Sequence, residues 1–128
     1  MTTSAQTALV IIAHGSREPD ANADAVYLAQ AIENRGAYAI VEAAFLELAE
    51  PTIDKAVETC VRRGARKVVL VPYFLSAGVH VRRDLAELTR RLSIDHPETA
   101  FRLAEPLGRH PGLVDIVIER ASGVAEND

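Results

Sequence analysis

The sequence has little cysteine, no long apolar run and no excess of basic residues. Its 128 residues include one cysteine, Cys60, which excludes an internal disulfide and any metal or cluster site built on a Cys-x-x-Cys pair. No stretch approaches the roughly 20 consecutive apolar residues of a membrane-spanning helix. The net charge of -4 argues against nucleic acid as a partner, because proteins that bind nucleic acid present a basic face.

Familiar nucleotide-binding and catalytic motifs are also missing. The glycine after the first apolar run, Gly15, is followed by Ser16, Arg17 and Glu18, so no G-x-G-x-x-G is formed. The chain has no Walker A lysine and no G-x-S-x-G nucleophile elbow. The first seven residues carry no basic region, so we expect no secretory signal. These absences predict a cytoplasmic protein without a membrane partner.

The composition is that of a globular protein. Hydrophobic residues make up 48% of the chain and charged residues 25%, which is not typical of disorder. A chain of 128 residues is long enough for one proper core. We therefore predict a single domain over residues 1–128, with its core at about residues 8–122.

Apolar runs alternate with segments of helical periodicity, four times over. The predicted strands are residues 8–13, 38–45, 67–72 and 100–104. The predicted helices follow Pro19, Pro51, a loop over residues 73–80, and a loop over residues 105–111. This order predicts an α/β fold with one small open parallel sheet of four strands. We expect the strand order 2-1-3-4, helices on both faces, and a truncated flavodoxin-like topology.

Each predicted helix has an apolar stripe that should face the sheet. The four stripes are Val26, Leu28, Ala29 and Ile32; Ile53, Val57, Cys60 and Val61; Val81, Leu85, Leu88 and Leu92; and Leu113, Val114, Val117, Ile118 and Ala121. Gly36 and Gly64 are placed to end the first two helices. Because Cys60 lies within a stripe, we predict a small core residue rather than a reactive thiol.

Three potential metal ligands follow three different strands. His14 comes directly after the first strand, Glu47 follows the second, and His80 follows the third. Ligands of open α/β sheets bind beyond the carboxyl ends of the strands, at the switch point between neighbouring strands. Two imidazoles and a carboxylate suit a divalent first-row metal, and neutral imidazole also accepts protons near pH 7. Taken singly, each residue has an ordinary interpretation as a loop or capping side chain.

The segment Leu75-Ser76-Ala77-Gly78-Val79 is apolar for a surface loop and small at its centre. Such a loop can lie flat against a broad apolar ligand with its backbone N–H groups exposed, or it can be a plain connector. A different comparison concerns Ala13-His14-Gly15, which is similar to the Arg-His-Gly of histidine phosphatases. Ala13 stands where that family needs a phosphate-binding arginine, so phosphoryl transfer is the weaker alternative.

Together these segments resemble the short-form sirohydrochlorin chelatases, the CbiX and SirB type within the class II chelatases. The resemblance rests on residues 13–17, on residues 45–51, and on residues 72–80 followed by Asp84. It runs from about residue 8 to residue 120. It implies a chelatase-like half-unit that inserts a divalent metal into sirohydrochlorin, in the pathways to sirohaem and cobalamin.

The resemblance also implies roles for individual residues. His14 and His80 match the two metal-binding histidines of the family, and His14 also matches its proton acceptor. Glu47 matches the acidic residue that joins them in related enzymes. The segment that touches the macrocycle corresponds to Phe74, Leu75, Ser76, Ala77, Gly78 and Val79. At a further substrate contact, where some relatives carry a basic residue, this chain has Glu50.

The metal is expected to be a substrate: cobalt, ferrous iron or nickel, with no organic cofactor. Arg17, Arg82 and Arg83 are candidate partners for the carboxylates of the tetrapyrrole, or ordinary surface charges. Full-length class II chelatases look like two such units in tandem, so the resemblance predicts a homodimer whose open rims face each other. A carrier that binds a tetrapyrrole or a metal without catalysis is the second alternative.

Overall fold

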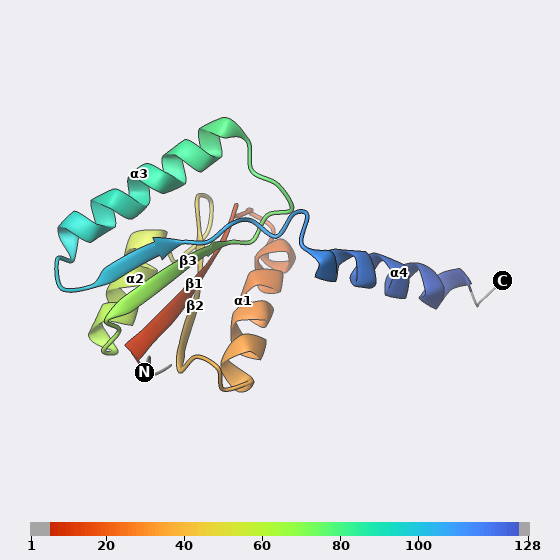
Figure 1. Ribbon diagram of the computed structural model, residues 1–128, viewed down its shortest axis with the longest axis horizontal. Helices are drawn as coiled ribbons and strands as arrows, with labels where there is room; N and C mark the ends of the chain where they lie inside the picture. The colour runs from red at the N-terminus through yellow and green to blue at the C-terminus, as the bar shows by residue number, and fades with distance from the viewer. Residues whose placement is uncertain (1–5, 126–128) are drawn as a thin grey trace.

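The computed structural model describes residues 6–125, and strands alternate with helices throughout (Figure 1). The elements are β1 (Thr7–Ala13), α1 (Pro19–Asn34), β2 (Ile40–Phe45), α2 (Ile53–Arg62), β3 (Lys67–Pro72), α3 (Val79–Asp95), β4 (Ala100–Leu103) and α4 (Pro111–Ala125). The second strand begins at Ile40, two residues later than predicted. None of the described helices is both long and apolar enough to cross a membrane.

The four strands form one parallel sheet in the order β2-β1-β3-β4, which confirms the predicted topology. Strand β1 lies between β2 and β3, and its residues from Thr7 to Ile12 are buried. Such burial on both faces is the reason that this strand reads as an unbroken apolar run. The loops at the carboxyl ends of β1 and β3 therefore lie side by side.

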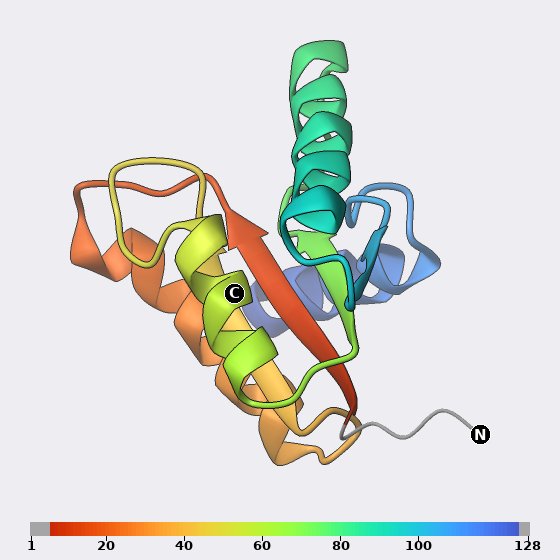
Figure 2. The same cartoon turned by 90° about the vertical axis from the view of Figure 1, so that its left-hand side faces the viewer.

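Helix α1 packs on one face of the sheet, and helices α2 and α3 pack on the other (Figure 2). The predicted stripe of α1 is wrong at Val26, which is 48% exposed, whereas Ala25 and Ala29 are buried. Small alanines let the helix axis approach the sheet closely. Val26 lies about 100° around the helix from Ala25, which turns it away from that contact.

Helix α2 packs through the predicted residues. Ile53, Val57 and Cys60 are buried, and Val61 is partly buried against the same core. The helix begins later than predicted, because the cap is Thr52, whose Oγ1 accepts a hydrogen bond from the Lys55 amide at 3.2 Å. Pro51 thus precedes the cap. Burial raises the pKa of the Cys60 thiol to about 12, as expected for a core residue rather than a reactive one.

Helix α3 begins earlier than predicted. Gly78 adopts an extended conformation as the N-cap, and its carbonyl accepts a hydrogen bond from the Arg82 amide at 3.0 Å. Val79 and His80 therefore belong to the first turn of the helix and not to the preceding loop. The predicted stripe is confirmed further along, where Leu85 and Leu92 are buried and Leu88 is partly buried.

Helix α4 departs from the prediction. It leaves the body of the molecule at the carboxyl end of the sheet and projects away from it (Figure 1). No residue of this helix is buried in the described structure, and Val114 and Val117 are 60% and 66% exposed. The predicted apolar stripe of α4 exists, but within one chain it covers no part of the sheet. The cause is the loop over residues 105–110, which turns at Arg109, where φ is +65°.

Candidate functional site

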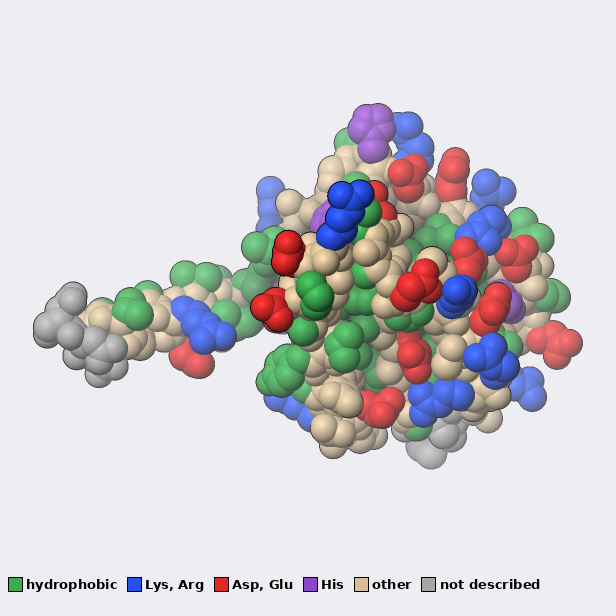
Figure 3. Space-filling view, turned by 180° about the vertical axis from the view of Figure 1, so that it is seen from behind, with side chains coloured by type: hydrophobic (Ala, Val, Ile, Leu, Met, Phe, Trp, Pro, Cys, Tyr) green, Lys and Arg blue, Asp and Glu red, His purple; other side chains and the backbone are tan. Residues whose placement is uncertain are grey.

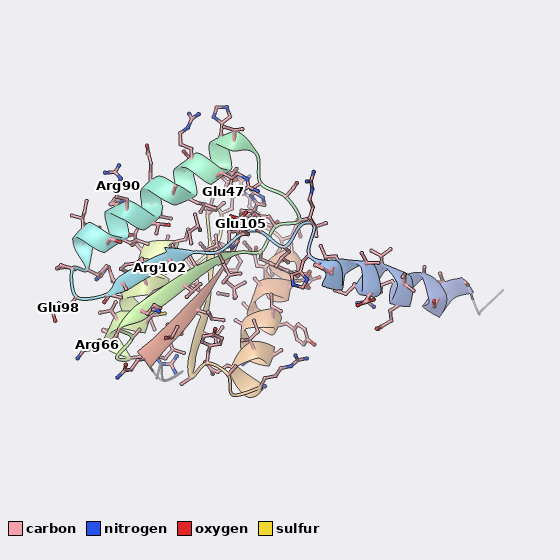
Figure 4. The ribbon with its side chains drawn as sticks, viewed as in Figure 1. Glu47, Arg66, Arg90, Glu98, Arg102 and Glu105 are labelled. Atoms are coloured by element: carbon pink, nitrogen blue, oxygen red, sulfur yellow. The ribbon has the colours of Figure 1, made fainter. Side chains whose placement is uncertain are left out.

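The three predicted ligands lie at the same edge of the sheet. His14 directly follows β1, Glu47 lies two residues beyond β2, and His80 is in the first turn of α3; all three are exposed. Figure 4 shows Glu47 toward the carboxyl end of the strands with Glu105, while Arg66 and Glu98 lie at the opposite end. The topology places positions 14, 47 and 80 at one edge, because parallel strands end at a common rim.

His14 is oriented by an aromatic contact. Its ring stacks on that of Phe74, with centroids 4.2 Å apart and planes inclined by 22°. Phe74 belongs to the core on the α2–α3 face and is only 5% exposed. A buried side chain thus supports one face of an exposed imidazole, which limits the positions that the ring can take. The sequence places Phe74 in the predicted contact loop but does not indicate this stacking.

The backbones of the β1 and β2 loops are joined beyond the strands. The Leu46 amide donates to the Ala13 carbonyl at 3.0 Å, and the Glu47 amide donates to the His14 carbonyl at 3.1 Å. Gly15 has a φ of +95°, and a Cβ atom at this position would overlap the Glu47 carbonyl oxygen. Glycine is required at position 15 because the backbones of the β1 and β2 loops are in direct contact there.

Asn22 holds the loop that follows His14. Its Oδ1 accepts a hydrogen bond from the Ser16 amide at 2.9 Å, and its Nδ2 donates to the Ser16 carbonyl at 2.7 Å. The Ser16 hydroxyl in turn accepts a bond from the Glu18 amide at 3.0 Å. Asn22 is a positioning residue that the sequence reasoning missed. Its only signal is an amide side chain in the first turn of a helix, close to a Gly-Ser turn.

Apolar side chains are exposed on two loops of this rim. Leu46 and Leu48 of the β2–α2 loop are 39% and 53% exposed. Leu75 before α3 and Val79 in its first turn are 67% and 69% exposed. Exposed apolar side chains gathered near polar ones are typical of a surface that binds a ligand. The sequence indicated Leu75 and Val79 but not Leu46 or Leu48.

A groove of about 600 Å³ lies beside the β1 loop, between the start of α1 and the β2–α2 loop. Arg17 and Glu50 both line it. Glu50 is exposed and forms an ion pair with Lys55 at 3.4 Å. Arg82 is held on the other side of the rim, where its Nε donates to the Ala77 carbonyl at 3.1 Å and it pairs with Glu105 at 3.3 Å.

The predicted ligands share a rim without forming a finished metal site. Within residues 6–125, no group of three or more His, Cys, Asp or Glu side chains is arranged to hold a metal ion. His14 and Glu47 are neighbours through their backbones, and His80 comes from the first turn of α3. Their joint ligation of one ion stays a prediction.

The sequence is similar to those of known proteins. The CbiX family model matches residues 8–124. The sirohydrochlorin cobaltochelatase of Priestia megaterium is 37% identical over 127 residues, which are 99% of this chain and 41% of that protein. The sirohydrochlorin cobaltochelatase of Methanocaldococcus jannaschii is 32% identical over 142 aligned positions, covering 91% of this chain and 98% of that protein. The chain thus spans less than half of one relative and nearly all of another.

Solved structures agree with the fold. A CbiX protein of cobalamin biosynthesis from Marinobacter aquaeolei VT8 superposes with a TM-score of 0.84 at 30% identity, over 95% of this chain and 99% of that one. The sirohydrochlorin chelatase SirB from Bacillus subtilis subspecies spizizenii, in complex with cobalt, gives a TM-score of 0.83 at 29% identity, over 94% of this chain and 51% of that one. Since sequence and topology agree over almost the whole length, the chain belongs to the CbiX family.

Proposed function

We propose that this protein inserts a divalent metal ion into sirohydrochlorin. The observation that carries the proposal is the common rim of His14, Glu47 and His80, beside loops with exposed leucine side chains. Relatives in sequence are named sirohydrochlorin cobaltochelatase and sirohydrochlorin ferrochelatase. Cobalt and ferrous iron are accordingly the metals that we expect, and nickel suits the same ligands.

Metal insertion exchanges two pyrrole protons for one divalent ion, so the net charge on the ring is unchanged. The reaction needs a group that accepts protons and ligands that release the ion to the ring. We assign proton acceptance to His14, presentation of the metal to His80, and support of both to Glu47. The stack on Phe74 supports the role of His14, because a base must be held at a fixed position to act on one N–H.

The macrocycle is flat, apolar on its faces and acidic at its edge. The exposed side chains of Leu75 and Val79 suit a ring face, with the backbone of residues 76–78 between them. Arg17, Arg82 and Arg83 are exposed and can pair with peripheral carboxylates. Glu50 does not suit an acidic substrate, and its partner Lys55 is the nearby positive charge. No organic cofactor is part of the proposal.

We further propose that the active form is a homodimer. One chain offers a single open rim, and a flat macrocycle presents two faces. A second copy with its rim opposed would cover the other face, and a twofold axis would make the two rims equivalent.

The direct test follows the absorption spectrum of sirohydrochlorin during incubation with the protein and cobalt, ferrous iron or nickel in turn. We expect insertion by the wild-type chain and a ~10²–10⁴-fold slower rate for His14→Ala, the usual cost of losing a positioned proton acceptor. His96→Ala is the matched control, since His96 caps the carboxyl end of α3, away from the rim. A decrease of less than tenfold for His14→Ala would show that this residue is not the base.

The same preparation tests the alternatives. A carrier would bind sirohydrochlorin or metal without turnover, and its His14→Ala variant would retain ring binding. Hydrolysis of p-nitrophenyl phosphate would indicate a phosphatase. Failure of every metal to enter the ring would contradict the chelatase proposal.

A further inference from the structure

The loop between β3 and α3 has little support of its own. We call its residues 74–78 the contact loop. Within the described chain, the amides of residues 75–78 donate no hydrogen bond. Leu75 in the loop and Val79 directly after it are 67% and 69% exposed. A segment with exposed side chains and few hydrogen bonds opens easily, so the position of this loop depends on the segments beside it.

The β4–α4 loop, residues 105–110, runs beside the contact loop (Figure 1). The Leu107 amide donates a hydrogen bond to the Phe74 carbonyl at 2.9 Å. One residue further, Gly108 lies so close to Leu75 that a Cβ atom would overlap the Leu75 carbonyl oxygen. Two successive residues of one loop thus contact two successive residues of the other. The β4–α4 loop supports the beginning of the contact loop through its backbone.

Arg82, in the first turn of α3, links the end of the contact loop to the β4–α4 loop. Its Nε donates to the Ala77 carbonyl at 3.1 Å, and its Nη1 donates to Glu105 Oε1 at 3.3 Å. Figure 4 labels Glu105 at the carboxyl end of the strands. A guanidinium suits this position, because its donors lie in one rigid plane and point in fixed directions. The next residue, Arg83, makes no hydrogen bond or ion pair within residues 6–125.

The ion pair alone would not single out Arg82. Basic and acidic side chains are interspersed over the face of the molecule that Figure 3 shows, and exposed ion pairs contribute little to stability. The side chain of Glu105 is 84% exposed. Arg82 is distinguished by its hydrogen bond to a main-chain carbonyl of the contact loop, because a bond from a charged donor is stronger than a neutral one. This bond fixes the loop at Ala77, three residues after the bond at Phe74.

We propose that Arg82 is a positioning residue for metal insertion. It holds the contact loop in the conformation that receives the macrocycle, and it acts through Ala77 and Glu105 rather than by touching the substrate. The proposal rests on the proposed function, in which this loop lies against the ring face. A loop that is ordered before binding loses less conformational entropy on binding, so the ring binds more tightly. The peripheral carboxylates of the ring are then left to Arg17 and Arg83.

His14 is held in place independently of Arg82. Its ring stacks on that of Phe74, which is 5% exposed and packs in the core on the α2–α3 face. Core packing keeps the Phe74 ring in position whether or not Arg82 holds Ala77. Loss of Arg82 should therefore weaken binding of the ring and leave kcat for metal insertion nearly unchanged. A side chain that served stability alone would change neither the affinity of the folded protein nor its kcat.

Titration of sirohydrochlorin without metal, followed by absorption, measures binding of the ring directly. Arg82→Ala should raise the dissociation constant by about five- to tenfold, the usual effect of losing a hydrogen bond from a charged donor. Its kcat for metal insertion should fall by less than about threefold. Arg90→Ala is the matched control, because it removes the same charge from α3 and Arg90 has no partner within the described chain. An equal loss of affinity in Arg90→Ala would attribute the effect to charge and overturn the proposal.

Removal of Glu105 distinguishes positioning of the loop from direct contact with the substrate. If Arg82 paired with a ring carboxylate, Glu105→Ala would free its guanidinium and remove a competing negative charge, so the ring would bind more tightly. If Arg82 positions the loop, Glu105→Ala should weaken binding of the ring and have no further effect on Arg82→Ala. Tighter binding of sirohydrochlorin by Glu105→Ala than by the wild type would overturn the proposal.

NMR relaxation of the backbone amides in the substrate-free protein tests the loop itself. Order parameters at residues 75–78 should fall from about 0.85 to below about 0.6 in Arg82→Ala and stay at the wild-type value in Arg90→Ala. Unchanged order parameters in Arg82→Ala would overturn the positioning role, as would a loosened loop with unchanged affinity for the ring. Metal insertion by the wild-type chain is measured separately, so the role of Arg82 can fail while the proposed function stands.

Discussion

The ring of Phe74 lies beneath the ring of His14, at a centroid distance of 4.2 Å. One residue belongs to the hydrophobic core and the other to the exposed rim, so the contact couples the packing of the protein to the position of its proposed base. Aromatic pairs of this kind contribute about 0.5–1.5 kcal/mol beyond the area that they bury. The packing of the core therefore helps to fix the orientation of the His14 ring.

Phe74→Leu should slow metal insertion by about two- to tenfold, the rate equivalent of the lost ring contact. The substitution keeps an apolar side chain, so we expect unfolding free energy to fall by about 1–2 kcal/mol. Insertion rate and urea denaturation measure the two effects. Phe101→Leu is the control, because Phe101 is 4% exposed and its ring lies 6.0 Å from that of His96. Equal slowing in both variants would attribute the effect to stability alone.

Gly15→Ala should destabilise the protein more than Gly36→Ala. Both glycines have positive φ, +95° and +82°, so both substitutions add backbone strain of about 1 kcal/mol. At Gly15 the new Cβ atom would overlap the Glu47 carbonyl oxygen. At Gly36 the new Cβ atom would have no neighbouring atom within 4 Å. We expect a difference of at least about 1 kcal/mol in urea denaturation. Similar losses would mean that the two loops of the rim can separate freely.

Asn22→Ala should lower the insertion rate by loosening the loop after His14. The substitution removes both hydrogen bonds to the Ser16 backbone, each contributing about 1 kcal/mol. Asn22→Asp retains an acceptor for the Ser16 amide but loses the donor to its carbonyl, so its effect should be intermediate. Hydrogen exchange at residues 15–18 reports the loosening directly. Asn34→Ala, at the exposed end of α1, is the control and should leave that exchange unchanged.

Cys60 should make stability depend on pH in the alkaline range. Burial raises the pKa of its thiol from 9.0 to about 12, so above pH 9 the unfolded chain releases a proton that the folded chain retains. The contribution is fully present below pH 9 and is lost as the pH rises toward 12, by about 1.4 kcal/mol per unit. The unfolding free energy of the wild type relative to Cys60→Ala should therefore decline over that interval. A constant difference would contradict the raised pKa.

The local sequence pattern was sufficient to predict the order of strands and helices. It also predicted which residues lie at the carboxyl edge of the sheet. The unbroken apolar run at residues 8–13 identified a parallel strand that is buried on both faces. The apolar run at residues 68–72 also identified a parallel strand, although Val69 and Val71 on one of its faces are only partly buried. Once the strand order 2-1-3-4 follows from the repeated strand–helix pattern, positions 14, 47 and 80 must lie at one edge. None of this requires knowledge of how side chains pack.

Contacts between distant segments were decided by the tertiary structure alone. The stack of His14 on Phe74, the clamp of Asn22 on Ser16 and the backbone meeting of Gly15 with Glu47 depend on how loops approach one another. The position of helix α4 was likewise not predictable from the sequence. Its apolar stripe is evident in the sequence, but periodicity indicates only that a helix is amphipathic and not which way the helix points. Only the loop at Leu107 and Arg109 determines that α4 projects from its own sheet, because direction is set by backbone geometry.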